Sequence, residues 1–463
     1  MLDINTCEQV IEAGLETGCD FVEIFEEDKF STAISQIDGK IEKVNSGNSY
    51  GIGIRLYHGK MSVYGSTNNN SLDNLITLAK DLAANFQGQA TVSAQRLEKV
   101  VYTNKHPIEK YPEDFDMDYK KGIIEKAYHG AKDYSELISK VNVNYSDSHQ
   151  KILVANSQGK YIEDSRVQTR IAVTAIVEKD GQLQDFYKAP GASKGLEFYD
   201  EIDLKQLGRE VSEKAIKMFH AKECPSGVMD VVINNGFGGV IFHEACGHLL
   251  EATSVAKNQS IFANKIGEKI ASELVSAVDD GTIQNAWGSS NIDDEGNFTQ
   301  RNVLIEKGIL KGYLVDQFNG RKMGSKSTGS GRRQSYHYQP TSRMNNTFIT
   351  NGESTLDELI EATKFGLFAA SLGGGSVNPA TGDFNFAVQE GYLIEDGKIT
   401  KPVKGASLVG NGAQVLQDID MVANNLLRAQ GMCGSASGSI PVDVGQPAIR
   451  VKKMTVGGRG GNI

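Results

Sequence analysis

Glycine is distributed unevenly along this chain, and that distribution limits what its second half can fold into. The chain has 463 residues and 50 glycines, of which 17 lie in residues 1–230 and 33 in residues 231–463. The second half therefore carries roughly twice the usual glycine content. These glycines are interleaved with apolar residues and show no G-X-Y period, which excludes collagen and a flexible linker. We expect tight turns and close backbone contacts in the second half.

The N-terminal region has the pattern of a helix, a set of strands and a second helix. Apolar residues recur at helical spacing over residues 4–15 and again over 72–86, where Ser71 is a suitable N-cap. Residues 20–66 alternate between apolar and polar side chains like paired antiparallel strands. This order predicts an α+β unit built on an antiparallel meander, because a βαβ repeat would alternate strands with helices.

The middle region repeats a mixture of helices and strands. Its periodicity predicts a helix over 116–139, strands from about 141 to 188, and a further helix near 201–220. Pro225-Ser226-Gly227 is a plausible boundary to the glycine-rich half. We therefore expect a middle α+β region that ends close to residue 223.

The glycine-rich half is predicted to be mainly β. Short β-like runs occupy residues 228–233, 302–306, 309–315 and 385–394, and a helix is expected near 354–370. The expected fold class is α+β, with a metal-site helix carried by the mainly β C-terminal domain. The expected domains are an N-terminal helix-strands-helix unit, a middle α+β region and a C-terminal domain, at residues 1–90, 91–223 and 224–463.

The charge balance limits the partners of the protein. Lysine and arginine number 48 against 58 aspartates and glutamates, a net charge of −10, so no basic field is expected to hold nucleic acid or an anionic membrane. The first residues do not resemble a secretion signal, and no apolar run approaches membrane-spanning length. Five cysteines without a regular spacing favour a reducing, cytoplasmic location.

One motif carries recognisable metal chemistry. His243-Glu244-Ala245-Cys246-Gly247-His248 follows an apolar segment, so two imidazoles and a carboxylate lie close together in sequence. Two imidazoles can bind one metal ion, and the carboxylate can serve a metal-activated water. The histidines are five residues apart, about 140° around a regular α-helix, and would point away from each other. The motif therefore predicts a π-type widening or a break in the helix, with Gly247 supplying backbone freedom.

A zinc site needs a third protein ligand, and the residues leave three candidates. Cys246 is three residues after His243, but a small buried apolar side chain is its simpler interpretation. Cys433 lies between Gly431 and Gly434, as a ligand on a loop would, although an ordinary turn cysteine fits equally well. His337 is the remaining candidate.

Arg332, Arg333 and His337 form a polar cluster between Gly331 and Pro340. These side chains could bind a peptide carboxylate or stabilise a tetrahedral oxyanion, and we take them as candidate substrate-binding residues. A solvated loop with aromatic packing is an equally good interpretation.

The chain resembles the TldD branch of the TldD/PmbA family of zinc metallopeptidases, also described as modulators of DNA gyrase. The resemblance begins with residues 235–239 and the motif of residues 243–248. Further similar segments extend over nearly the whole chain: Gly51–Gly65, Gly331-Arg332-Arg333, Arg343-Met344, Glu390-Gly391-Tyr392-Leu393-Ile394, Pro402-Val403-Lys404-Gly405, Gly431-Met432-Cys433-Gly434 and Val456-Gly457-Gly458.

The resemblance implies a cytoplasmic zinc-dependent peptidase. It implies one Zn²⁺ per chain bound by His243, His248 and Cys433, with Glu244 as the general base. It also implies a dimer, either of identical chains or with a PmbA/TldE-like partner. The expected activity is hydrolysis of extended or unfolded peptides by a metal-activated water.

Two other functions compete with this hypothesis. The first is a peptide-binding or assembly subunit whose metal is structural, but such a site has no need of Glu244. The second is a redox enzyme with a Cys/His zinc site, which is disfavoured because the chain has no dinucleotide-binding fingerprint.

Overall fold

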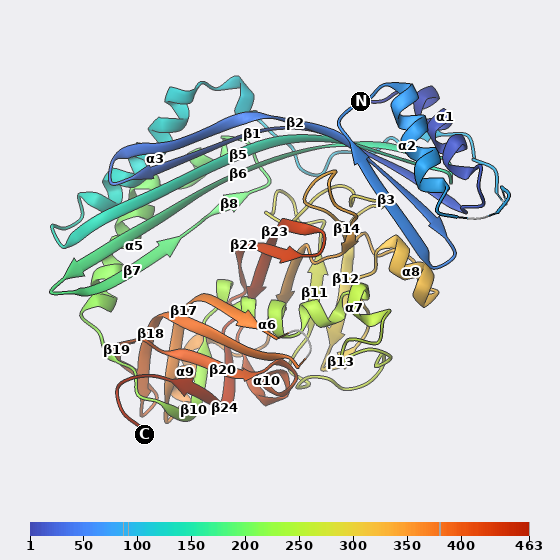
Figure 1. The fold of residues 1–463 in the computed structure, drawn as a ribbon. Helices are drawn as coiled ribbons and strands as arrows, with labels where there is room; N and C mark the ends of the chain where they lie inside the picture. The colour runs from blue at the N-terminus through green and yellow to red at the C-terminus, as the bar shows by residue number, and fades with distance from the viewer. Residues whose placement is uncertain (87, 91, 379–380, 463) are drawn as a thin grey trace.

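A computed structural model describes residues 1–86, 88–90, 92–378 and 381–462. The chain forms a mixed α+β fold built on three main β-sheets (Figure 1). A long, curved sheet from the first half arches over the two sheets of the C-terminal half. The expected α+β class, with a mainly β C-terminal region, is confirmed.

The curved sheet combines strands from the N-terminal and middle regions. Its strands follow the order β3-β2-β1-β5-β6-β4, and β7 and β8 also pair with β6. Strands β1 and β5 are antiparallel partners from Glu23 to Ile37, so the two regions share one continuous sheet. The bounds are β1 Phe21–Ile37, β2 Lys40–His58, β3 Met61–Thr67, β4 Glu98–Lys99, β5 Ile138–Asn156, β6 Lys160–Lys179, β7 Gln182–Lys188 and β8 Gly191–Ala192.

Two pairs of helices cover the ends of this sheet. Helices α1 and α2 bury their apolar stripes against β1 and β2, and α3 and α5 bury theirs against β5 and β6. Ser71 occupies the N-cap of α2, but its side chain makes no capping hydrogen bond. The helix expected over 116–139 ends at Lys132, because Ile138 already pairs with β6. The helical bounds are α1 Ile4–Leu15, α2 Leu72–Ala83, η1 Pro112–Asp114, α3 Met117–Lys132, α4 Phe198–Glu201 and α5 Leu204–Phe219.

The first C-terminal sheet closes on itself. Its strands follow the order β17-β10-β24-β20-β18-β19-β9, β21 pairs with β24, and an additional β17–β18 pairing closes a five-stranded ring. The bounds are β9 Lys222–Glu223, β10 Gly227–Ile233, β17 Phe365–Val377, β18 Asp383–Glu395, β19 Lys398–Lys404, β20 Ser407–Asn411, β21 Ile419–Val422 and β24 Ile449–Gly457, with helices α9 Leu356–Glu361 and α10 Gly412–Asp418.

The helix expected near 354–370 is wrong over its last part. Helix α9 ends at Glu361, and Phe365 begins β17, whose Gly366 pairs in parallel with Asp230 of β10. An apolar run of this length suits a buried strand as well as a helix, and the pairing with β10 decides between them.

The second C-terminal sheet carries a strand that matters for the site. Its order is β13-β12-β11-β16-β23-β22, which leaves β22 at one edge. The run expected over 309–315 is reduced to the two residues of β13. The bounds are β11 Ala277–Asp280, β12 Arg301–Glu306, β13 Ile309–Leu310, β16 Asn346–Ile349, β22 Leu427–Ser435 and β23 Gly438–Gln446; nearby lie helix α8 Gln317–Met323 and the small pair β14 Gly331–Arg332 and β15 Thr341–Ser342.

Buried ion pairs join the curved sheet to the C-terminal half. Arg55 pairs with Glu23 at 2.8 Å and with Glu295 at 2.7 Å, and Arg333 pairs with Glu23 at 2.9 Å. All four side chains are almost fully buried. A buried charge is strongly destabilising without an opposite charge beside it, so these ion pairs fix how the two halves of the chain meet.

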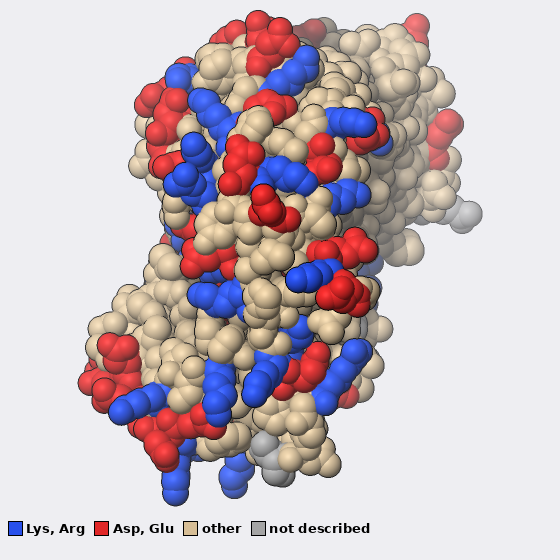
Figure 2. Space-filling view, turned by 90° about the vertical axis from the view of Figure 1, so that its left-hand side faces the viewer, with Lys and Arg blue, Asp and Glu red and all other residues tan. Residues whose placement is uncertain are grey.

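The surface charges are mixed rather than segregated on the face shown in Figure 2, where acidic and basic side chains alternate. Among the described residues, no helix is both long enough and apolar enough to span a membrane.

Candidate metal centre

The motif helix begins at a tight turn after strand β10. Gly236 has φ +70°, a left-handed conformation that suits glycine, and it opens the short 3-10 helix η2, Gly236–Gly239. Helix α6, Val240–Ala245, follows directly. A Cβ atom on Gly239 would lie 2.4–2.5 Å from three backbone atoms of Gly445 in β23. Glycine therefore allows α6 to lie directly against this strand.

The helix breaks between the two histidines, as the spacing predicts. Helix α6 ends at Ala245, Cys246 has φ −130° and ψ −49°, and the 3-10 helix η3 continues over Gly247–Leu250. Gly247 has a different role from the one expected, because its φ is not positive. A Cβ there would lie 2.2 Å from Sδ of Met344, so close packing requires the glycine.

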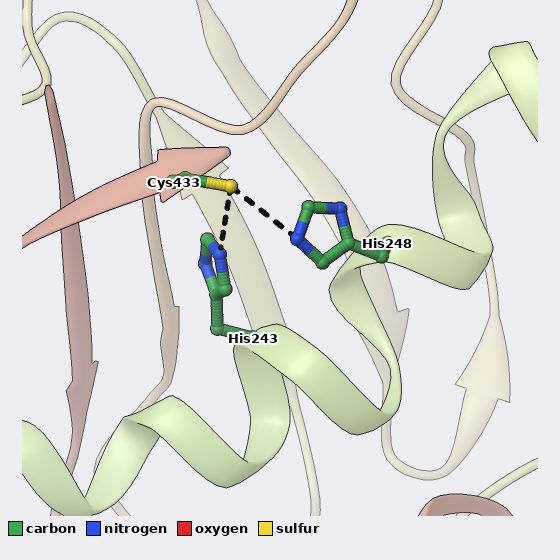
Figure 3. Close-up of side chains that lie close together, drawn as sticks. All are labelled: His243, His248 and Cys433. Carbon is green, nitrogen blue, oxygen red and sulfur yellow. Dashed lines mark hydrogen bonds between the residues drawn. The ribbon is translucent and has the colours of Figure 1, made fainter. Parts of the chain in front are cut away.

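The break brings both imidazoles toward one sulfur atom (Figure 3). The Nε2 atoms of His243 and His248 each lie 3.3 Å from Sγ of Cys433. The two rings are nearly perpendicular, with centroids 5.0 Å apart. Cys433 lies in the edge strand β22, whereas its glycine neighbours predict a loop. Its strand partner across the hairpin is Ile440 of β23.

The three ligand atoms fit a zinc ion. They lie within 4.8 Å of one another and offer two imidazole nitrogens and one thiol sulfur, a donor set typical of zinc. Tetrahedral zinc, with bonds of about 2.0–2.1 Å to nitrogen and about 2.3 Å to sulfur, places nitrogen and sulfur about 3.5 Å apart. The observed separations of 3.3 Å are close to that value.

A second carboxylate orients His248. Nδ1 of His248 donates to Oε2 of Glu251 at 3.1 Å, and Glu251 is buried. A carboxylate on the far ring nitrogen fixes the tautomer that leaves Nε2 free to bind a metal. Nδ1 of His243 is also buried but has no hydrogen-bond partner among the described residues. His248 is therefore the more strongly oriented of the two imidazoles.

The electrostatics of the cluster favour a thiolate. Burial by itself raises the pKa of Cys433, but the adjacent His243 and His248 outweigh burial and lower that pKa to about 4. Burial lowers the pKa of His248, whereas Glu251 and Cys433 raise it well above its ordinary value. A thiolate is the form of cysteine that binds metal ions.

Glu244 lies beside the cluster without belonging to it. Its Oε2 is 3.8 Å from Nε2 of His248, and the side chain is about 30% exposed. A carboxylate that is free of a strong partner and open to solvent can accept a proton from a nearby water molecule.

A buried arginine holds the strand that carries Cys433. Arg343 is fully buried and donates to the backbone oxygen of Cys433, to the backbone oxygen of Gly438 at 2.9 Å and to Oγ of Ser437 at 2.9 Å. These contacts connect both strands of the β22–β23 hairpin to one guanidinium. Arg343 therefore positions the cysteine opposite the two histidines.

The remaining sequence candidates lie outside the cluster. Cys246 is completely buried in the apolar core, and burial raises its pKa. His337 is exposed and stacks on Tyr336 with ring centroids 4.0 Å apart. Arg332 donates to the backbone oxygens of Met344 and Pro441, and Arg333 pairs with Glu23. Both arginines also line a cavity of about 490 Å³ under the curved sheet.

Sequence reasoning did not identify Glu251 or Arg343 as site residues. For Glu251 a signal existed, because an acidic residue three positions after His248 interrupts the apolar run Leu249-Leu250. For Arg343 the sequence held no such signal, because its role depends on contacts with a hairpin that is distant along the chain.

Three family models match the chain. They are described as PmbA/TldA metallopeptidase domain 1, central domain and C-terminal domain, and they match residues 22–85, 110–219 and 226–458. The C-terminal model includes all the residues of the candidate metal centre.

Individual relatives cover nearly the whole chain. A metalloprotease TldD homologue of Haemophilus influenzae is 37% identical over 91% of this chain and 89% of its own length. A TldD homologue of Buchnera aphidicola is 36% identical over 90% and 88%. A metalloprotease of Methanocaldococcus jannaschii is 32% identical over 97% and 99%.

Solved structures share the fold at low sequence identity. A candidate modulator of DNA gyrase from Bacteroides thetaiotaomicron has a TM-score of 0.77 and 21% identity over 98% of both chains. TldE from Thermococcus kodakarensis has a TM-score of 0.75 and 19% identity over 97% of this chain and 99% of its own.

Proposed function

This chain belongs to the PmbA/TldD metallopeptidase family, and on that premise we propose that it is a zinc-dependent peptidase that cleaves extended or unfolded peptides. In this proposal His243, His248 and Cys433 bind one Zn²⁺, and Glu244 is the general base. The observation that carries the proposal is the convergence of both Nε2 atoms on the sulfur of Cys433, each at 3.3 Å.

The proposed chemistry divides between the metal and the carboxylate. Bound zinc would polarise the scissile carbonyl and lower the pKa of the attacking water, since one thiolate and two neutral imidazoles leave the site formally positive. Oε2 of Glu244 would take the proton from the water and deliver it to the leaving amine. Glu251 would keep His248 in the metal-binding tautomer, and Arg343 would hold Cys433 in place.

The edge strand β22 supports binding of extended peptides. In the described part of the chain it pairs as a strand only with β23. Side chains of Arg170, Trp287 and Arg343 donate to three of its backbone oxygens, so an added strand would form main-chain hydrogen bonds with the backbone groups that remain. Cys433 lies on this strand, so a peptide added to it would pass beside the metal centre. Main-chain recognition requires little sequence preference and excludes segments that are already folded.

We also propose that the working particle is a dimer, either of two identical chains or of this chain with a PmbA/TldE-like partner. The structural similarity to TldE supports the second form. A cytoplasmic location is part of the same proposal, and it is supported by five cysteines that are all unpaired.

Two substitutions test the proposed roles. Glu244→Gln is expected to retain one zinc per chain and to lose hydrolysis of an unfolded peptide. Cys433→Ser is expected to lose the metal, as measured by elemental analysis, whereas the matched control Cys246→Ser keeps it. Unchanged hydrolysis by Glu244→Gln would exclude the mechanism and favour a peptide-binding subunit with a structural metal. Metal loss in Cys246→Ser rather than in Cys433→Ser would overturn the ligand set.

A further inference from the structure

A cavity lies on the far side of the strand that carries Cys433. It has a volume of about 490 Å³, is partly open to solvent, and is lined by residues of β1, β5, β6, the β22–β23 hairpin and the segments 287–294 and 332–334. Met432 lines this cavity. Neighbouring side chains on a strand point to opposite faces, so Met432 faces the cavity while Cys433 faces the histidines. The cavity is thus separated from the metal centre by the thickness of one strand.

The cavity is strongly basic in a protein of net charge −10. Five cationic and two acidic side chains line it, and they are Lys29, Arg166, Arg170, Arg332, Arg333, Asp147 and Asp294. Both acidic groups already have partners, because Asp147 pairs with Lys120 at 2.7 Å and Asp294 with Arg166 at 2.6 Å. Arg333 is likewise neutralised, by Glu23.

Three cations among the described residues of the cavity form no ion pair. Among the described residues, neither Arg170 nor Arg332 has a carboxylate within ion-pair distance, and the ammonium of Lys29 has no hydrogen-bond or ion-pair partner. Arg332 donates only to the backbone oxygens of Met344 and Pro441, at 2.5 and 2.8 Å. Arg170 donates to those of Ala189 and Gln430, at 3.1 and 3.2 Å. Neutral carbonyl groups do not compensate a full charge.

The guanidinium groups have capacity for a further ligand. Each has five N–H donors, of which the recorded bonds use two. Burial lowers the pKa of Arg332 to about 10, because attraction to Asp294 and Asp279, neither of which forms an ion pair with it, only partly offsets the loss of solvation. A carboxylate matches the planar fork of arginine and would supply the missing charge.

We propose that this cavity binds a carboxylate group of the peptide substrate through Arg170, Arg332 and Lys29. The proposal rests on the proposed peptidase function, because it assumes that a peptide lies along β22. Side chains of such a peptide would alternate between the two faces of the strand, so one group would enter the cavity while the backbone passes the metal centre. The carboxylate would be either the peptide C-terminus or the side chain of an aspartate or glutamate.

Trp287 provides a direct measurement of binding. It is the only tryptophan of the chain, and it lines the cavity with Arg170 over its ring at 5.6 Å. A group that enters the cavity and engages Arg170 would change the fluorescence of this ring. The measurement does not depend on hydrolysis, so it separates failure of this proposal from failure of the proposed function.

The test uses the Glu244→Gln protein and four unfolded alanine- and serine-rich peptides of equal length. They combine a central Glu or Gln with a free or amidated C-terminus. Titration monitored by Trp287 fluorescence should show roughly 10- to 100-fold tighter binding for peptides with the preferred carboxylate. Dependence on amidation identifies the C-terminus as the ligand, and dependence on Glu against Gln identifies a side chain. Equal affinity for all four peptides would overturn the proposal.

Two substitutions test whether the preference for a carboxylate arises in the cavity. Arg170→Met and Lys29→Met should each reduce the preference for the carboxylate, and Lys29 is partly exposed, so its variant is expected to fold. The matched control is Lys40→Met, which removes the same charge from an exposed position at the start of β2. A preference that survives in Lys29→Met and Arg170→Met would show that the carboxylate binds elsewhere.

Discussion

Substitution of Gly239 by alanine tests whether the contact between α6 and β23 sets the geometry of the metal centre. Gly239 has φ −60° and ψ −9°, which alanine adopts without strain. In the absence of a steric conflict, Gly→Ala would stabilise the protein by about 0.4–1 kcal/mol through the unfolded chain. Any loss of stability must therefore come from the added methyl group.

The size of the conflict follows from the distances. The new Cβ would lie 2.4–2.5 Å from the backbone of Gly445, whereas ordinary contacts begin near 3.4 Å. Since backbone atoms cannot rotate away as a side chain can, α6 and β23 must separate by about 1 Å. Overpacking of this kind costs about 1–3 kcal/mol. Zinc–ligand distances vary by only about 0.2 Å, so this shift of His243 away from Cys433 should disrupt the site.

The assay combines thermal unfolding with zinc analysis. Gly239→Ala is expected to melt at a lower temperature and to lose most of its zinc. Gly434→Ala, beside Cys433, is the control, because a Cβ there meets nothing within 4 Å, and it should retain both properties. A Gly239→Ala protein with full zinc content and an unchanged melting temperature would refute the claim that this contact positions the histidines.

Three further substitutions probe the groups around the site and between the two halves. Glu251→Gln should weaken zinc binding about 10- to 100-fold in a chelator competition, because His248 loses the carboxylate that orients it; equal affinity would contradict this role. Arg343→Met should lower zinc affinity to a similar degree by releasing the hairpin, and full affinity would show that the hairpin holds Cys433 without it. Arg55→Met should cost about 3–5 kcal/mol in denaturant unfolding, since it leaves Glu23 and Glu295 short of a buried partner, and a small effect would mean that solvent reaches them.

Local sequence patterns identified many of the elements of the fold. The apolar spacing of residues 4–15 predicted α1 at its observed bounds, and the alternation over 20–66 predicted the meander of β1, β2 and β3. These patterns are informative because each side of a helix or strand repeats with a fixed period. They failed over residues 365–370, where an apolar run fits a buried strand and a helix equally well.

For the candidate metal centre, too, the sequence determined some features and left others open. The five-residue spacing of His243 and His248 by itself required a break in the helix, since a regular helix would direct the two rings apart. The motif also placed Glu244 next to the first histidine. Both conclusions depend only on residues that are neighbours along the chain.

The third ligand and its supports depend on the tertiary structure. Cys433 is 185 and 190 residues from the two histidines, and the residues alone left it no better placed than an ordinary turn cysteine. Its position follows from the pairing of β22 with β23 and from the contact of Arg343 with that hairpin. Gly247 is a second example. The sequence showed that a glycine lies at the break in the helix, but only the close packing of Met344 against it explains why no larger residue fits there. Local periodicity determines which elements form, whereas contacts between distant segments decide which side chains meet.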